Sequence, residues 1–168
     1  MFNKEYSFEG KHAKFVRDLV KNDRSGLINR NVDLLILAPI IGFLYGKTSS
    51  SDNGEETTKI FTSQLVKEKS KLKFIYQLIT ILEGDKKNKS KEEVLRQALD
   101  NDEFNEYEQL FNSYVLGGVE ILHDKLFDEN FDQDDYLNNL YEFVKDFDKD
   151  LSSRTNEKDI EDIIEKYE

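Results

Sequence analysis

The scarcity of helix-breaking residues is the feature that most constrains this chain, whose 168 residues include one proline and eight glycines. Proline removes a backbone donor, and glycine raises the entropic cost of a helix, so both usually interrupt helices. A sandwich of short strands would also need many turn residues. The uninterrupted stretches therefore predict an all-α fold, a single-domain bundle of about six or seven helices.

One segment, Val32 to Tyr45, is apolar on nearly every side and is predicted to be the central helix of the core. Pro39 lies inside it, where the missing backbone donor should kink the helix. Gly42 has no side chain, so a neighbouring backbone can approach the helix closely there. The alternative is that Pro39 and Gly42 mark a break into two shorter helices. A bilayer needs about twenty apolar residues to span it, so this segment is too short and no membrane association is predicted.

A second core helix is predicted from Asp102 to Leu126, where apolar residues recur at helical spacing. Gly117 and Gly118 lie together inside this segment. A glycine within a helix costs about 1 kcal/mol relative to alanine, so the pair needs a compensating reason. Close packing of another helix is the simpler explanation, and contact with a ligand is the alternative.

Four further helices are predicted from apolar periodicity: Gly10 to Lys21, Ser63 to Glu83, Ser90 to Leu99 and Asp134 to Phe147. Asn29 or Asn31 is predicted to cap the central helix, and Ser90 with Glu93 matches a capping box. Five residues of the last of these helices are predicted to face inward: Leu137, Leu140, Tyr141, Val144 and Phe147.

The remaining segments are predicted to be irregular. The residues before Gly10 read as a frayed start, and Lys47 to Glu56 reads as a polar, mobile loop. Thr58 to Thr62 has brief β character, but no other segment is an obvious partner strand. We therefore expect at most a short extended segment near residues 58–62.

The chain is predicted to consist of a helical core domain of residues 1–151 and a C-terminal segment of residues 152–168. Residues 152–168 read as a polar linker followed by an acidic amphipathic helix. An apolar stripe runs along this helix, which either docks on the core or binds a partner: Ile160, Ile163, Ile164 and Tyr167.

Composition excludes several classes of function. The chain has no cysteine, which rules out disulfides, thiolate zinc sites and cysteine nucleophiles. No secretory signal is visible, so a cytoplasmic location is expected. The net charge of −11 should repel nucleic acid, and direct binding to it is not expected. Four lysines lie close together in the sequence, but a spacing of two scatters them around a helix: Lys67, Lys69, Lys71 and Lys73.

The inventory of catalytic side chains is thin. His12 and His123 are the two histidines, and neither has a serine or carboxylate at helical spacing in a convincing array. No phosphate-binding loop, dinucleotide fingerprint, nucleophile elbow or zinc-protease motif occurs. We therefore predict no catalytic residues, no cofactor and no enzymatic activity.

The acidic string from Asp128 to Asp135 resembles a calcium loop, because oxygen-bearing residues alternate along it. Gln133 stands where the sharp-turn glycine should be, and Asn139 stands where a bidentate glutamate is needed. An acidic helix entry, favoured by the helix dipole, explains the string more simply, so no metal site is predicted.

Three motifs together resemble the small family of Dnd-system-associated protein 4, encoded near DNA phosphorothioation and other phage-defence genes. They are Phe15 to Leu19, Asn31 to Asp33 leading to Ile41 to Phe43, and Tyr114 to Leu122. The resemblance covers residues from about 10 to 127 and leaves out the acidic extension after Asp128. It implies an accessory subunit of a bacterial defence or restriction complex and carries over no catalytic residue.

Two functions are consistent with this reading. The first is a non-catalytic accessory or regulatory subunit that binds a larger protein, either beside Gly117 and Gly118 or through the C-terminal stripe. The second is an acidic DNA mimic, in which carboxylates from Asp124 to Asp150 occupy the basic groove of a nucleic-acid-binding protein. The oligomeric state does not follow from the sequence.

Overall fold

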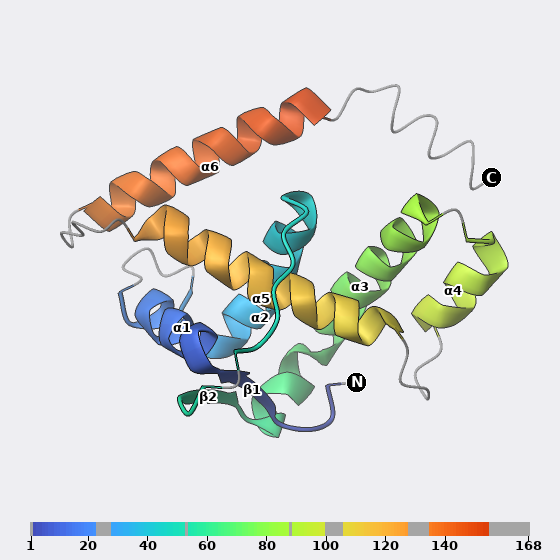
Figure 1. Ribbon diagram of the computed structural model, residues 1–168, viewed down its shortest axis with the longest axis horizontal. Coiled ribbons are helices and arrows are strands. Elements are labelled where there is room, and N and C mark those ends of the chain that lie inside the picture. Colours follow the sequence, from blue (N-terminus) through green and yellow to red (C-terminus); the bar gives the residue numbers. More distant parts are fainter. Residues whose placement is uncertain are drawn as a thin grey trace. The chain divides into compact units, whose positions relative to one another are not determined.

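The computed structural model describes residues 2–22, 28–52, 54–87, 89–99, 106–127 and 135–154. These residues form six helices and a two-stranded sheet, which confirms the predicted helical fold (Figure 1). The elements follow in the order β1 Tyr6–Glu9, α1 Gly10–Asn22, α2 Asn31–Leu44, β2 Thr57–Ile60, α3 Thr62–Lys86, α4 Lys91–Leu99, α5 Glu106–Leu126 and α6 Asp135–Arg154.

The chain divides into two compact units, residues 1–124 and 125–168. Helix α6 lies in the second unit and continues to Arg154, so the first residues of the predicted linker are helical. The predicted C-terminal helix lies outside the described residues. No helix in the described part of the chain has the length and apolar character needed to cross a membrane.

The core of the first unit is built where α2 and α5 meet backbone to backbone. A side chain on Gly42 would overlap the carbonyl of Tyr114, and one on Gly118 would overlap the carbonyl of Ala38. This confirms the close approach predicted at Gly42 and inside the Asp102–Leu126 segment. Gly118 is therefore explained by the packing of two helices, whereas Gly117 meets the backbone of Lys47 and Thr48, which follow α2.

The sheet was not predicted, because the sequence analysis found no partner for the segment after Thr57. Strands β1 and β2 pair antiparallel, with Phe8 opposite Thr58 and Tyr6 opposite Ile60. Phe8 and Ile60 are fully buried on the same face. The predicted frayed start is therefore wrong, since four residues are too few to show the alternation that marks a strand.

Other elements follow the sequence closely, with one difference at a helix start. Helix α1 buries Ala13, Val16 and Leu19, whose spacing is helical as predicted. Helix α2 is capped by Asp33, whose carboxylate accepts the backbone N–H of Arg30 at 2.8 Å, and neither candidate asparagine caps it. A carboxylate in the first turn accepts hydrogen bonds from free N–H groups, and its negative charge is stabilised by the positive end of the helix dipole.

Helix α6 presents a different face from the one predicted. Tyr136 and Phe143 are its buried aromatic residues. Leu137, Tyr141 and Val144 were predicted to face inward but are 51%, 65% and 53% exposed. The helix carries apolar residues on two sides, so periodicity alone does not decide which side is covered.

Candidate functional site

A polar cluster around a buried carboxylate joins side chains from three separate parts of the chain. Its centre is the carboxylate of Glu120 on α5. His12 Nε2 lies 3.1 Å from Glu120 Oε1, and Ser49 Oγ donates to the same oxygen at 2.6 Å. Lys11 Nζ lies 2.8 Å from Oε1, and Lys47 Nζ lies 3.5 Å from Oε2. We call these five residues the Glu120 cluster.

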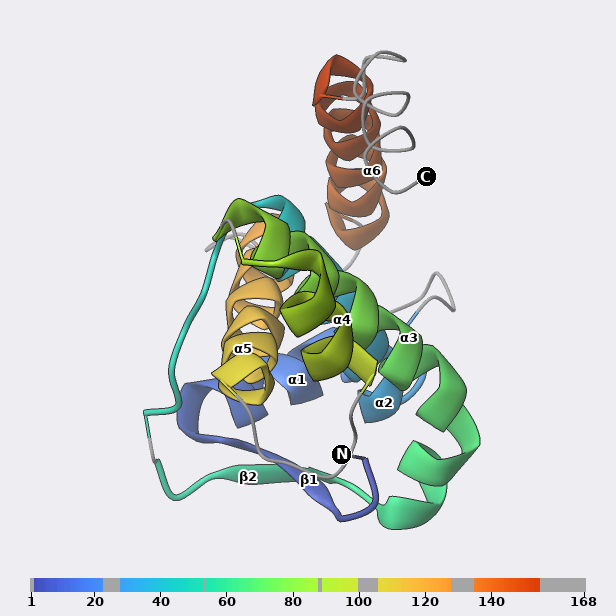
Figure 2. The same ribbon diagram turned by 90° about the vertical axis from the view of Figure 1, so that its right-hand side faces the viewer.

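The segment between α2 and β2, which we call the strap (residues 45–56), delivers two members of this cluster. Figures 1 and 2 show it running from the end of α2 across α5 to β2. The backbone N–H of Ser49 donates to the carbonyl of Ser113 at 2.9 Å. The carbonyl of Lys47 lies so close to Gly117 that a side chain there would overlap it. The strap therefore lies directly on the α5 backbone.

The far end of the strap is fastened to α1. Asp52 accepts the backbone N–H of Lys11 at 3.0 Å and that of Gly54 at 3.2 Å. These two hydrogen bonds lower the pKa of Asp52. The carboxylate caps α1 from outside the helix, because Lys11 is its second residue and lacks a partner one turn back.

Burial and charge act in opposite directions on Glu120. Burial favours the neutral acid, but hydrogen bonds from Lys11 and Ser49 and the charge of Lys11 outweigh it, so the pKa of Glu120 falls to about 2. Burial also lowers the pKa of His12, which is fully enclosed. Near neutral pH the cluster therefore contains a carboxylate and an uncharged imidazole.

The carboxylate of Glu120 determines which ring nitrogen of His12 carries the hydrogen. A carboxylate only accepts hydrogen bonds, so Nε2 carries the hydrogen and Nδ1 is left as an acceptor. Within the described residues Nδ1 is buried without a hydrogen-bond partner. His12 and Ser49 both donate to the same carboxylate oxygen and not to each other, which differs from a nucleophile activated by a histidine base. This geometry is suited to fastening the strap onto α1 and α5.

The members of the Glu120 cluster lie far apart in the chain, so local sequence patterns do not reveal the cluster. The partner of His12 is not at helical spacing, because Glu120 lies 108 residues away on another helix. His123 is also placed by distant residues: it stacks on Phe15 and lies 3.6 Å from Asp18 Oδ2. Burial lowers the pKa of His123 despite this carboxylate.

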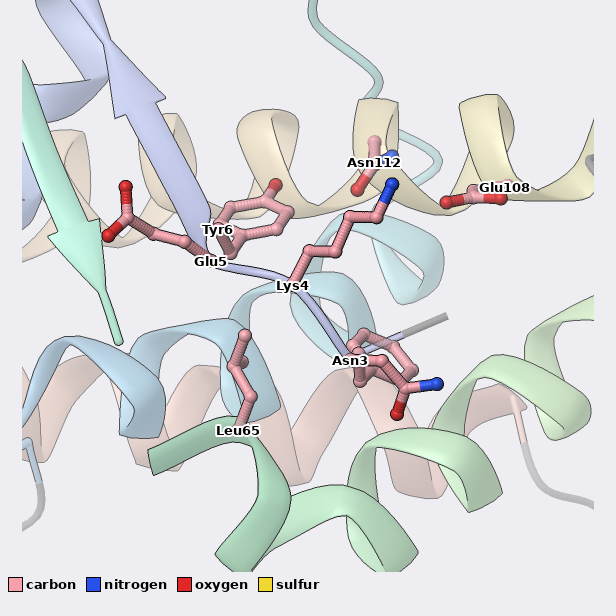
Figure 3. Close-up of a pocket in the computed structure, with 8 residues that line it drawn as sticks. Asn3, Lys4, Glu5, Tyr6, Leu65, Glu108 and Asn112 are labelled. Atoms are coloured by element: carbon pink, nitrogen blue, oxygen red, sulfur yellow. The ribbon is translucent and has the colours of Figure 1, made fainter. Parts of the chain in front are cut away.

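A surface pocket of about 350 Å³ lies beside the N-terminal segment (Figure 3). Lys4 extends across it toward Asn112 of α5, with Glu108 further along the same helix. Glu5 is engaged by Lys59, whose Nζ lies 2.7 Å from its carboxylate. The lining mixes one lysine with two glutamates and two asparagines, so it favours no single charge of ligand.

Two exposed helix faces combine apolar and charged side chains. On α3, Lys67, Lys71, Phe74 and Leu78 recur at intervals of four, three and four residues, which places them on one side of the helix. Phe74 is 64% exposed and Leu78 is 44% exposed. We call these four residues the α3 stripe. The α6 stripe is Leu137, Tyr141, Val144 and Asp148, with the same intervals.

The predicted partner-binding residues have different outcomes. Gly117 and Gly118 are buried against the backbone of the strap and of α2. Binding of a partner beside them stays a prediction. Ile160, Ile163, Ile164 and Tyr167 lie outside the described residues, as does most of the calcium-like string. Among the described residues, no group of three or more histidine and acidic side chains is placed to hold a metal ion.

Comparison with known protein families identifies a family that matches most of the chain. The model of a family described as DNA sulphur modification system-associated protein 4 matches residues 9–163. The match includes the whole Glu120 cluster and extends through the acidic region after Asp128, which the resemblance in the sequence had left out. No curated protein and no solved structure matches the chain.

Proposed function

The chain belongs to the family of DNA sulphur modification system-associated protein 4, and from this premise we propose that it is a cytoplasmic, non-catalytic accessory subunit. It acts by binding a larger protein of a bacterial anti-phage defence or DNA modification and restriction complex. The family name associates the chain with a DNA sulphur modification system. The accessory role and the larger partner are the proposal.

The observation that carries this proposal is the contrast between the interior polar groups and the surface. The buried carboxylate of Glu120 is held by four side chains of its own chain. By contrast, large apolar side chains such as Phe74 and Tyr141 remain exposed. Exposed apolar side chains among charged ones are typical of protein interaction surfaces. The fold therefore supports binding more than chemistry.

The exposed face of α6 favours an accessory subunit over a DNA mimic. A mimic of phosphates needs a dense array of unneutralised carboxylates. On α6 the carboxylate of Glu142 is paired with Lys145 at 3.2 Å, and Tyr141 lies beside the same lysine. Apolar and basic side chains thus interrupt the acidic ones, which suits a mixed protein interface.

Purification from the native host tests the proposal. The tagged chain should bring down a larger protein encoded beside it, in fixed stoichiometry. Ile163→Asp with Ile164→Asp should abolish this, because two charges would enter the predicted apolar stripe. Lys158→Gln with Lys166→Gln is the matched control, since it changes the net charge equally but leaves the stripe intact.

A wild-type chain that brings down no protein from its own operon would overturn this proposal. Retention of the same partner by both double variants would show that the C-terminal stripe is not the surface that binds it. If the wild type and the Ile163→Asp, Ile164→Asp variant both bind a partner, and this binding falls steeply with increasing salt, the DNA mimic is indicated instead.

A further inference from the structure

We propose that the α3 stripe of one copy of this chain binds the α6 stripe of a second copy, in antiparallel orientation. Both stripes lie on described helices, labelled in Figure 1, and both have large apolar side chains exposed in the single chain. The occupant of each face is the other face on the second molecule. This interface is separate from the binding of a larger protein proposed above.

The spacing of the two stripes points to a helix as the partner of each. Residues at intervals of four, three and four form a seam that packs against another helix at a small crossing angle, about 20°. The α3 stripe begins at Lys67 and ends at Leu78, and the α6 stripe begins at Leu137 and ends at Asp148. The two seams are therefore equal in length.

Charge selects the antiparallel orientation. The lysines of the α3 stripe lie toward the start of α3, whereas the aspartate of the α6 stripe lies toward the end of α6. In antiparallel packing Lys67 faces Asp148 of the second copy. In a parallel arrangement the same lysine would face Leu137, and Asp148 would face Leu78.

The apolar residues pair in the same antiparallel register. Phe74 meets Tyr141 of the second copy, and Leu78 meets Leu137. These side chains are 64%, 65%, 44% and 51% exposed in the single chain, in that order, so the contact would remove substantial apolar surface from water. Aromatic residues near the centre of an interface also contribute most to binding.

A second copy of the chain offers both an α3 stripe and an α6 stripe. Each molecule carries one α3 stripe and one α6 stripe, so each copy holds the partner of the other copy's stripe. Reciprocal pairing of the two stripes would give a two-fold symmetric dimer, the commonest form of homo-oligomer. Within the single chain Lys71 is paired with Glu68 at 3.0 Å. Lys67 is the lysine of the α3 stripe that meets an opposite charge, Asp148, on the second copy.

Sedimentation equilibrium on the full chain measures the predicted dimer. The wild type should sediment with twice the chain mass. Phe74→Asp should raise the dimer dissociation constant by about thirtyfold or more, and Tyr141→Asp should do the same. Phe61→Asp is the matched control, because Phe61 is 61% exposed but lies off the stripe, and it should leave the dimer unchanged.

Charge exchange tests the orientation. Lys67→Glu and Asp148→Lys should each weaken the dimer, and the two together should restore it. Failure of the double variant to recover would contradict the antiparallel register. Circular dichroism of each variant confirms that the helices persist, so that weaker association is not caused by unfolding.

Cysteine cross-linking tests the contact directly, because the chain has no cysteine of its own. A Phe74→Cys protein mixed with a size-tagged Tyr141→Cys protein should form a mixed disulfide dimer on mild oxidation. Phe61→Cys in place of Phe74→Cys should not.

Three outcomes overturn the inference. They are a monomer at every concentration, a dimer insensitive to both Asp variants, and binding of duplex DNA by the wild type that is lost in Lys67→Glu. None of these decides whether a larger partner co-purifies through the C-terminal stripe, so the two proposals fail independently.

Discussion

At the scale of single residues, three glycines determine how closely the first unit packs. Gly42 and Gly118 place α2 against α5, and Gly117 places the strap against α5. In each case a side chain would meet backbone atoms, which have little freedom to move aside. The glycines thus have a structural role that does not depend on a ligand.

Gly118→Ala is predicted to lower the free energy of unfolding by about 3 kcal/mol, because the added methyl group forces α2 and α5 apart. This opposes the gain of about 1 kcal/mol that alanine normally brings to a helix. Urea denaturation measures the change. Gln109→Ala, at an exposed position on the same helix, is the control and should leave stability nearly unchanged. Equal stability of Gly118→Ala and the wild type would contradict the packing described.

Glu120 makes a pH-dependent contribution at the residue scale. Its pKa is about 2 in the folded protein against an ordinary value of 4.5, so the folded state favours the ionised form. The resulting stabilisation is complete above the ordinary pKa and is lost as the pH falls toward 2. The shift corresponds to about 3 kcal/mol at neutral pH. His12 acts in the same direction, because its lowered pKa makes proton uptake below its ordinary pKa favour the unfolded chain.

Glu120→Gln is accordingly predicted to reduce stability at pH 7 by about 2 to 3 kcal/mol. The difference from the wild type should shrink between pH 5 and pH 2, where the wild-type carboxylate takes up its proton. Thermal unfolding across this pH range measures it, with the exposed Glu92→Gln as control. A difference that stays constant with pH would mean that the ionised carboxylate is not the stabilising group.

At the scale of elements, replacing a side chain by alanine should have different effects on the two faces of α6. Phe143 is 9% exposed and Tyr141 is 65% exposed. Phe143→Ala should destabilise α6 by about 3 kcal/mol, whereas Tyr141→Ala should cost less than about 1 kcal/mol in the monomer. Amide hydrogen exchange within α6, measured on the Phe74→Asp background to suppress association, compares the two. Equal effects would contradict the assignment of the faces.

The strap should depend on its end anchors. Asp52→Ala removes the acceptor for the backbone N–H groups of Lys11 and Gly54. We expect faster amide exchange at Lys11 and through the strap, while exchange in α3 stays unchanged. Ser50→Ala, at an exposed position in the strap, is the control. Unchanged exchange at Lys11 would show that the cap is not formed in solution.

Local pattern was enough to predict most helices but not the contacts between distant segments. Periodicity and capping residues predicted α1 to α5, because these signals lie within a few residues of each other. The pairing of β1 with β2 and the Glu120 cluster depend on segments separated by much longer stretches of chain. The covered side of α6 was mistaken because Tyr136 and Tyr141 both belong to apolar faces. The features that the sequence did not predict therefore all depend on tertiary contacts.

At the scale of the whole molecule, the polar and apolar groups are divided between interior and surface. The carboxylate of Glu120 is bound by side chains of its own chain, and exposed apolar side chains occur in stripes on α3 and α6. The net charge of −11 makes the lysines of α3 a distinct local feature. Together with membership of the DNA sulphur modification system-associated protein 4 family, this distribution supports the proposed accessory role.

Native mass spectrometry of the chain isolated from its own host tests that central proposal most directly. We expect a defined assembly that contains this chain and a larger protein of the same defence system. The Ile163→Asp and Ile164→Asp double variant should yield this chain without the larger protein. Isolation of the wild-type chain alone, together with turnover of a DNA or nucleotide substrate by that isolated chain, would contradict the account.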